Sequence, residues 1–343
     1  MRVLVTGGCG FIGSNLVRLI RAIRPAWHVT NLDLMTYAAH PDGLSDLAQD
    51  PQYRFVRGDI ADGPLVQDLA RNVDGILHLA AESHVDRSIV DAAPFIRTNV
   101  DGTRVLLDAA RRFGLRFLHV STDEVYGSLG PTGSFTEATP LAPNSPYAAA
   151  KASSDLLVRA YRETYGLDAV ITRCSNNYGP YQFPEKMIPL FVTRLMQDQS
   201  IPLYGDGGNI RDWLHVQDHA RALLLSYENG RGGEVYNIGA RNEWTNLALT
   251  HELLRLMDKP HSLIQPVTDR LGHDRRYSID PSKIEQELGW FPTIPFTGGL
   301  VKTVAWYQTN AAWWRPLVSQ ASLARVPADA DGSNDDRSPA CAS

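Results

Sequence analysis

The chain has 343 residues and a mass of 37.9 kDa, which suits one large α/β domain or two lobes. Apolar residues make up 43% and charged residues 21%, as in a globular protein with a sizeable core. The net charge of −5 argues against a nucleic-acid or membrane-surface partner, and no apolar run reaches the roughly 18 residues that cross a bilayer. Only three widely spaced cysteines occur and no signal-peptide pattern opens the chain, so we expect a cytoplasmic protein without a disulfide framework.

The first half alternates short apolar runs with amphipathic stretches. Strands are predicted over 2–6, 29–33, 53–57, 75–80, 116–121 and 169–173, and helices over 12–24, 94–113 and 146–165. Nearly continuous apolar strands that alternate with helices are typical of a parallel sheet covered on both faces. The predicted fold class is therefore α/β, a Rossmann-type doubly wound parallel sheet.

The pattern changes near residue 175, after which turn formers are dense and helices and strands are shorter. This change indicates a smaller C-terminal α/β substrate lobe. We expect a Rossmann domain over 1–175 with a returning segment near 210–240, a second lobe mainly over 176–318, and a disordered tail over 319–343 that has almost nothing to bury.

Glycines follow the first predicted strand at Gly7, Gly10 and Gly13. Glycine permits a tight turn and close approach of the backbone to a pyrophosphate, which the N-terminus of the next helix can bind. Asp33 ends the second strand, 20 residues after Gly13, where a carboxylate can accept a hydrogen bond from a ribose hydroxyl. This arrangement predicts a dinucleotide site that prefers NAD to NADP. Other strand ends contribute Asp59 and Ile60 near the adenine, and Leu79, Ala80 and Ala81 near a ribose.

Two further patterns carry chemistry. Tyr147 and Lys151 are four residues apart on one predicted helix, so the ammonium can lower the phenol pKa and let tyrosinate act as a base. Thr122, Asp123 and Glu124 follow a predicted core strand. An acid beside a base allows proton removal at one carbon and protonation of a leaving hydroxyl at the next.

His215 and His219 have the i, i+4 spacing of metal ligands. No third ligand is apparent, so we expect no metal site.

Several motifs together carry a resemblance. Residues 80–88, 122–127, 176–180, 184–186 and 272–277 are similar in kind and order to the extended short-chain dehydrogenase/reductase superfamily and, within it, to the dTDP-glucose 4,6-dehydratase family. The resemblance covers about residues 1–316. Two positions depart from the family pattern, since Ala39-His40 replaces the usual Gly-Asn and Leu271 replaces a usual proline.

The resemblance implies conversion of dTDP-glucose to dTDP-4-keto-6-deoxyglucose and water, for deoxysugar biosynthesis such as that of rhamnose. Tyr147, held by Lys151, would take the proton of the sugar 4-hydroxyl while hydride passes from C4 to NAD, with Thr122 hydrogen-bonded near that hydroxyl. Glu124 would then remove the C5 proton while Asp123 protonates the departing 6-hydroxyl. Hydride would finally return to C6.

The resemblance also implies binding residues. Those expected to bind NAD are Gly7, Gly10, Phe11, Ile12, Gly13, Asp33, Thr36, Asp59, Ile60, Leu79, Ala80, Ala81, Thr98, Tyr147, Lys151 and Asn177. Those expected to bind the nucleotide sugar are Ser83, Asn176, Glu185, Lys186, Met187, Pro202, Tyr204, Arg211, Asn246, His273, Arg276 and Tyr277. Relatives pair two helices per subunit, so a homodimer through 94–113 and 146–165 is expected.

Three alternatives stay open. A UDP-hexose 4-epimerase would share Tyr147 and Lys151 but needs no acid pair, so Asp123 and Glu124 argue against it. A UDP-sugar dehydratase would share that pair, and the sequence does not decide between dTDP and UDP. A non-catalytic nucleotide-binding scaffold is disfavoured, because a binding module needs none of these four side chains.

Overall fold

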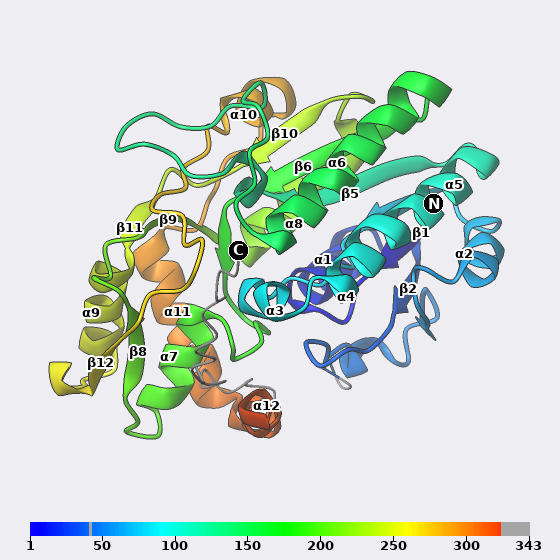
Figure 1. Cartoon of the computed structure of the whole chain (residues 1–343). Helices are drawn as coiled ribbons and strands as arrows, with labels where there is room; N and C mark the ends of the chain where they lie inside the picture. The colour runs from blue at the N-terminus through cyan, green and yellow to red at the C-terminus, as the bar shows by residue number, and fades with distance from the viewer. Residues whose placement is uncertain (41–42, 324–343) are drawn as a thin grey trace, which may run out of the picture.

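The computed structural model describes residues 1–40 and 43–323, with side chains up to Val318. Its centre is a seven-stranded parallel sheet (Figure 1). In spatial order the strands are β10 (Val235–Ile238), β6 (Ala169–Cys174), β5 (Arg116–Thr122), β4 (Gly75–His78), β1 (Arg2–Thr6), β2 (His28–Asp33) and β3 (Tyr53–Arg57). The doubly wound parallel fold is thus confirmed. The six strands predicted for the first half are all present, with ends shifted by one or two residues where they differ.

Helices cover both faces of this sheet because alternate strand residues point to opposite sides. Val3 and Val5 pack against α1 (Phe11–Ile23) and α8 (Val216–Asn229) on one face. Leu4 on the other face packs against α2 (Gly63–Ala70), α5 (Thr103–Phe113) and α6 (Pro146–Tyr165). The short α10 (Ser282–Leu288) joins the first layer.

The helix predicted over 94–113 is observed as one continuous helical segment in which an α-helix, a π-helix and a second α-helix follow one another. A short α4 (Ala93–Phe95) leads into a π-helix, η2 (Ile96–Gly102), and then into α5. A separate α3 (Val85–Val90) precedes them. π-Helical turns widen the helix and are frequent at functional sites.

The smaller lobe is built from two small sheets and four helices (Figure 1). One sheet is β11 (Glu243–Thr245), β9 (Ile210–His215) and β7 (Asn176–Tyr178), and the other pairs β12 (Ile264–Val267) with β8 (Ile201–Tyr204). The helices are α7 (Met187–Leu195), α9 (Asn246–Leu256), α11 (Phe296–Thr309) and α12 (Ala311–Leu323). The described residues also include three 3-10 helices, η1 (Ser45–Leu47) and η3 (Asp123–Tyr126) in the main domain and η4 (His261–Leu263) in the smaller lobe.

The chain returns from this lobe to the main sheet between β9 and β11. Helix α8 covers the sheet and β10 pairs with β6 at its border, within the segment near 210–240 that the sequence suggested. Helix α12 runs to Leu323, past the expected end of the lobe at 318, and the rest of the expected tail lies outside the described residues. No helix within 1–40 or 43–323 combines the length and apolar character that crossing a membrane requires.

Candidate active site

The carboxyl ends of the main-sheet strands define the site. Thr6 at the end of β1 pairs with Leu32 and His78, and Thr122 at the end of β5 pairs with Cys174. Parallel strands in register end at one side of the sheet, where ligands bind in folds of this kind. The loops that follow these strands carry the predicted cofactor and catalytic residues, so the fold brings them to one place.

The glycine loop after β1 fits a diphosphate. Gly7 has φ +72°, and a Cβ there would lie 2.6 Å from the backbone of Ala80; a Cβ on Gly13 would lie 2.1 Å from the carbonyl oxygen of Gly7. Among residues 1–40 and 43–323, leaving out its chain neighbours, that same oxygen is the only atom within 4 Å of a Cβ on Gly10, at 3.4 Å. Packing therefore leaves open space above Gly10, and no side chain caps α1, which begins at Phe11. Uncapped N–H groups beside open space suit an anionic group.

Asp33 lies beside this loop. Its two carboxylate oxygens accept hydrogen bonds from the backbone N–H of Cys9 (2.9 Å) and of Met35 (2.8 Å). Burial raises the pKa of Asp33, and these two bonds oppose the increase. Asp59, at the end of the next strand, pairs with Arg97 at 2.5 Å, and Ile60 beside it is buried. The carboxylates at these strand ends fit a dinucleotide, because they can accept hydrogen bonds from ribose hydroxyls.

Substitutions at Gly7 and Gly10 should affect different properties, stability in the first case and dinucleotide binding in the second. Gly10→Ala should leave the melting temperature nearly unchanged, since its φ of −77° suits alanine, yet the methyl group enters the open space and should weaken dinucleotide binding about tenfold or more. Gly7→Ala should instead unfold more easily, because its backbone is left-handed and already touches Ala80. Calorimetric titration and thermal melts check both, and normal binding by Gly10→Ala would contradict this view of the loop.

Tyr147 and Lys151 lie in the first turns of α6, which Ser145 caps by accepting from the N–H of Ala148 at 3.1 Å. Lys151 Nζ donates to the carbonyl oxygen of Val120 at 2.8 Å. The Tyr147 ring packs edge-on against Phe95, with centroids 6.3 Å apart. Both side chains are buried at the same end of the sheet, as their spacing predicts.

The electrostatics of this pair differ from the prediction. Burial lowers the pKa of Lys151 to about 8, and Asp155 opposes that decrease. Burial raises the pKa of Tyr147 well above 10, and Glu124 adds to the increase. Burial and the nearby acids therefore outweigh any lowering of this phenol pKa by the ammonium, so the net shift is opposite to the one that the spacing suggests. A hydrogen bond with Thr122 is the opposing contribution.

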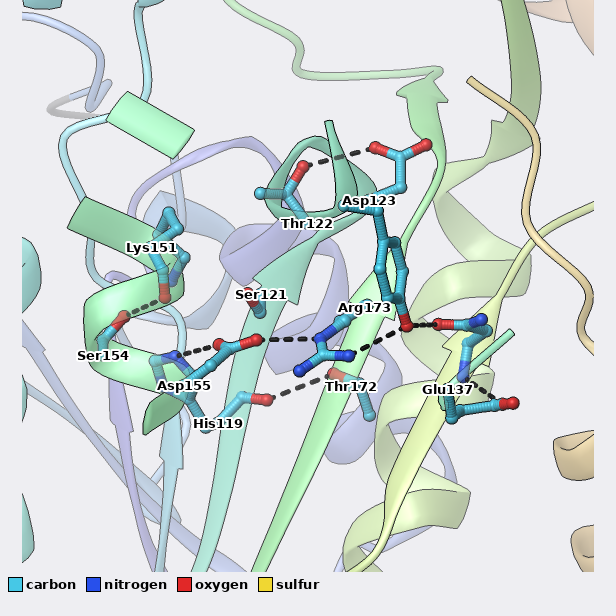
Figure 2. Close-up of polar contacts among 12 residues, drawn as sticks. His119, Ser121, Thr122, Asp123, Glu137, Lys151, Ser154, Asp155, Thr172 and Arg173 are labelled. Carbon is cyan, nitrogen blue, oxygen red and sulfur yellow. Dashed lines mark hydrogen bonds and ion pairs between the residues drawn. The ribbon is translucent and has the colours of Figure 1, made fainter. Parts of the chain in front are cut away.

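The acids Asp123 and Glu124 form the start of η3, directly after β5. Thr122 Oγ1 donates to Asp123 Oδ1 at 3.4 Å (Figure 2). The same oxygen accepts from the Glu124 N–H at 3.3 Å. Burial raises the pKa of both carboxyls. For Asp123 the neighbouring Glu124 and Asp212 raise the pKa further, whereas for Glu124 the cations Arg270, Lys186 and Arg211 lower it.

The two acids thus have different protonation preferences. Asp123 is the one whose pKa is raised well above its ordinary value, and its Oδ2 is buried with no hydrogen-bond partner among the described residues. Glu124, surrounded by cations, ionises more readily. Neighbouring acids whose environments separate their pKa values are the usual basis for one acid and one base in an active site.

The raised pKa of Glu124 predicts how turnover depends on pH. If Glu124 acts as the base, turnover falls as the pH drops through its pKa, which lies above the ordinary value of 4.5. A profile of kcat against pH should therefore show an acidic limb above pH 4.5, while the thermal melt stays intact there. A kcat that is constant down to that pH would contradict the assignment of Glu124.

Most of the predicted substrate residues lie on or near elements of the smaller lobe, whereas Ser83 lies in the loop after β4. Lys186 Nζ donates to the carbonyl oxygen of Ser83 at 2.9 Å, and Glu185 accepts from Tyr37 at 3.2 Å. Met187 begins α7, Asn176 begins β7, Asn246 begins α9, and Pro202 and Tyr204 lie on β8, where the Tyr204 ring meets His273 edge-on at 6.4 Å. Arg211 lies over the ring of the buried Tyr277, 4.4 Å from its centroid.

The arginines are arranged differently from the prediction. Arg276 is buried and pairs through two nitrogens with Glu243 at 2.6 and 2.7 Å, and it donates to the carbonyl oxygens of Gly130 and Gly133. Its guanidinium is therefore committed to internal partners. Arg270, which the sequence analysis missed, acts electrostatically on Glu124, and its Nε is buried without a hydrogen-bond partner. Sequence alone could flag this basic stretch, but the partner Glu243 is supplied by tertiary structure.

A matched pair of variants tests this revision. Arg270→Gln should raise the KM for a nucleotide sugar about 10- to 100-fold, the usual loss for a charge-assisted phosphate contact, with little change in melting temperature. Arg276→Gln should mainly lower the melting temperature, because it leaves Glu243 half-buried without its cation. Steady-state kinetics and thermal melts distinguish them, and the reverse pattern would restore Arg276 to the site.

Asn99 is a second residue that the sequence analysis missed. Its amide accepts from the N–H of Glu82 at 2.9 Å and donates to the Glu82 carbonyl at 3.0 Å, which fixes the loop after β4. Its neighbour Thr98, predicted at the cofactor, shares the π-helical turn. An asparagine beside Thr98, on a predicted amphipathic helix, is the signal that could have identified this residue.

The histidine pair has internal partners. His219 bonds through Nδ1 to the amide oxygen of Asn177 at 3.0 Å, and the ring of His215 accepts from the N–H of Gln217. Burial lowers the pKa of His219 to about 3. Within the described part of the chain, no three His, Cys, Asp or Glu side chains form a group that could hold a metal ion.

The parallel sheet, the glycine loop and the Tyr147–Lys151 pair define the class, which is the extended short-chain dehydrogenase/reductase fold. A family model described as GDP-mannose 4,6 dehydratase matches residues 4–303. A dTDP-glucose 4,6-dehydratase of an Actinoplanes species is 57% identical, covering 92% of this chain and all of the relative. That of Streptomyces niveus is 54% identical over 96% and 99% of the two chains.

The solved structures agree. DesIV, a dTDP-glucose 4,6-dehydratase from Streptomyces venezuelae solved with NAD and TYD bound, superposes with a TM-score of 0.90 at 55% identity, covering 92% of this chain and 100% of that one. The chain belongs to the dTDP-glucose 4,6-dehydratase family.

Proposed function

We propose that this protein is an NAD-dependent dTDP-glucose 4,6-dehydratase, a carbon–oxygen lyase that forms dTDP-4-keto-6-deoxyglucose and water for deoxysugar biosynthesis. Relatives of this name align over nearly the whole chain. The observation that carries the proposal is the acid pair beside Tyr147, in which Asp123 is buried, Glu124 is part-buried, and the environments of the two shift their pKa values by different amounts.

NAD, when bound, supplies a reversible hydride acceptor that takes hydride from C4 and returns it to C6. Gly10 and the free end of α1 would hold its diphosphate, and Asp33 and Asp59 would face its adenosine end. The NAD bound to DesIV supports the same cofactor here.

The chain's own residues divide the proton transfers. Tyr147 takes the proton of the 4-hydroxyl, with Thr122 beside it and Lys151 anchored below on Val120. Glu124 removes and later returns the C5 proton, while Asp123 delivers its proton to the departing 6-hydroxyl. The unpartnered Oδ2 of Asp123 is suited to meet that hydroxyl.

Alternative reactions fit the site less well. A 4-epimerase would share Tyr147 and Lys151 but has no use for the buried Asp123 and the part-buried Glu124, which are costly to desolvate. A nucleotide-binding scaffold would need none of the four. A UDP-sugar dehydratase would use the same chemistry. The choice of thymine over uracil, which we assign to the loop around Tyr204, is therefore the part of the proposal that rests most on the relatives.

Mass spectrometry tests the proposal. The purified protein is incubated separately with dTDP-glucose and UDP-glucose, without added cofactor. Loss of one water from the dTDP sugar alone is expected and would also establish retained NAD. Equal loss from both sugars would overturn the dTDP preference, and no change in either after NAD is supplied would overturn the dehydratase assignment.

We also propose a cytoplasmic homodimer in which 1–175 with the returning 210–240 segment binds NAD and 176–318 binds the sugar nucleotide. Apolar side chains exposed near the two helices expected to pair support the dimer, among them Val90 on α3, Ile96 on η2 and Leu156 on α6. Unpaired Cys9 and Cys174 support a reducing compartment. A monomeric mass by light scattering over a broad concentration range would overturn the dimer.

A further inference from the structure

Beneath Lys151 lies a buried acid that the proton transfers above do not use. Tyr147, Lys151 and Asp155 recur every four residues on α6, so they share the face that packs on β5 and β6. Only 1% of Asp155 is exposed. The row therefore continues from the catalytic end of the helix into the interior of the protein.

The Asp155 carboxylate has two partners (Figure 2). Its Oδ2 accepts from Arg173 Nε at 2.8 Å, and its Oδ1 lies 3.3 Å from His119 Nε2. Burial lowers the pKa of His119 to about 4, which leaves its ring neutral. The charges buried together are thus Asp155, Arg173 and Lys151, and Asp155 is the anion between two cations.

Arg173 extends the connection toward the acid pair. Its second nitrogen donates to the Tyr126 hydroxyl at 2.9 Å, and that hydroxyl donates to Asn237 Oδ1 at 2.8 Å (Figure 2). Glu137 in turn accepts from the Asn237 N–H at 2.9 Å. Tyr126 is the last residue of η3, the turn that begins with Asp123 and Glu124. A continuous row of polar contacts therefore joins α6 to the turn that bears both acids.

A structural role alone does not account for this arrangement. Burying an ion pair costs desolvation that apolar side chains of similar size avoid, so such a pair is weak support for stability. The buried hydrogen bonds from Arg173 to Asp155 and to Tyr126 instead fix the positions of the groups that they join. Here the fixed members are the two ends of one active site.

We propose that Asp155 is a positioning residue, which holds Lys151 charged and in place on one side and, through Arg173 and Tyr126, fixes the turn of Asp123 and Glu124 on the other. The inference rests on the proposed dehydratase function. It predicts that the two sides of Asp155 affect different stages of turnover. The contact with Lys151 should affect the oxidation at C4, and the connection to the turn of Asp123 and Glu124 should affect the loss of water.

The groups that face Lys151 set the direction of the pH effect. They are Asp155 and Tyr147 on α6, His78 on β4, His119 on β5 and Cys174 on β6. Asp155 is the largest influence that raises the Lys151 pKa, which lies at about 8. Without Asp155 that pKa falls, so activity that needs the ammonium is lost at a lower pH.

The experiment compares Tyr126→Phe, Asp155→Asn and a control, Tyr236→Phe. The control removes a buried hydroxyl that bonds Glu287 at 3.0 Å, on β10 away from the catalytic pair. Each purified enzyme, with its NAD content measured after denaturation, is mixed with dTDP-glucose in a single turnover. Reduced nicotinamide is followed by absorbance and water loss by mass spectrometry, and thermal melts are recorded.

Tyr126→Phe should slow water loss about 3- to 10-fold, the effect of one lost hydrogen bond, while oxidation stays within about twofold and reduced nicotinamide accumulates. Asp155→Asn should slow oxidation about tenfold or more and move the alkaline limb of kcat to lower pH by about one unit, with NAD content unchanged. Tyr236→Phe should change neither stage.

Other results would overturn the inference. If Tyr126→Phe and Asp155→Asn lower the melting temperature but leave both stages and the alkaline limb unchanged, the network is structural only. If Asp155→Asn does not fold, Tyr126→Phe alone decides, since its ring remains. Failure of the unmodified enzyme to act on dTDP-glucose would instead overturn the proposed function, so the two failures are distinguishable.

Discussion

Asp123→Asn combined with Glu124→Gln will lower the rate of water loss from dTDP-glucose by at least about 100-fold, because it removes both the acid and the base of the elimination. The fold should tolerate the change. Burial raises the pKa of both carboxyls, and amides of the same shape replace groups that the interior already disfavours as anions. Oxidation at C4 depends on Tyr147 and should continue, so reduced nicotinamide should accumulate on the enzyme.

The measurement is mass spectrometry of the sugar nucleotide over time, together with absorbance of the reduced cofactor and a thermal melt. Asp74→Asn is the matched control, since Asp74 is an exposed carboxylate paired with Arg2 at the opposite end of the main sheet. The control should act at the unmodified rate. Water loss by the double variant at more than about a tenth of the normal rate would contradict an acid–base role for the pair.

Tyr147→Phe should reduce oxidation at C4 by about 100- to 1,000-fold, the contribution usual for a positioned acid–base group. The ring remains, so its packing on Phe95 and the helix cap at Ser145 are kept. Since this variant is blocked before the elimination, reduced nicotinamide should not accumulate, in contrast to the acid-pair variant.

Rapid mixing with dTDP-glucose under absorbance detection checks this order of events. Tyr227→Phe serves as the control, because Tyr227 is a buried phenol on α8 near Gly75, at the opposite end of the sheet. If Tyr147→Phe reduces the cofactor at a normal rate but fails to lose water, Tyr147 acts in a later stage than proposed.

Most of the main sheet could be predicted because its strands are buried on both faces. Strands such as 2–6 and 169–173 are nearly continuous apolar runs, and helices cover them on both faces of the sheet. The helix cap at Ser145 was equally local, since a serine before Pro146 is a start signal that needs no tertiary context.

The properties that could not be predicted depend on what surrounds a side chain. The Tyr147–Lys151 spacing placed both groups correctly, but the direction of the phenol pKa follows from burial and from Glu124, which arrive from elsewhere in the chain. Likewise Arg270 and Arg276 are chemically alike in sequence. They differ in their surroundings, because β11 places Glu243 beside Arg276 and so pairs that guanidinium internally.

The place of β10 has a consequence for synthesis of the chain. This strand, Val235–Ile238, pairs with β6 and follows it by some sixty residues that belong largely to the other lobe. A ribosome therefore releases β6 long before its neighbour exists, and during that interval its backbone N–H and C=O groups are open to pairing with other chains. Aggregation of incomplete translation products should accordingly be greatest for chains that stop between β6 and β10. Nascent chains arrested just beyond β10 should be the first to resist proteolysis.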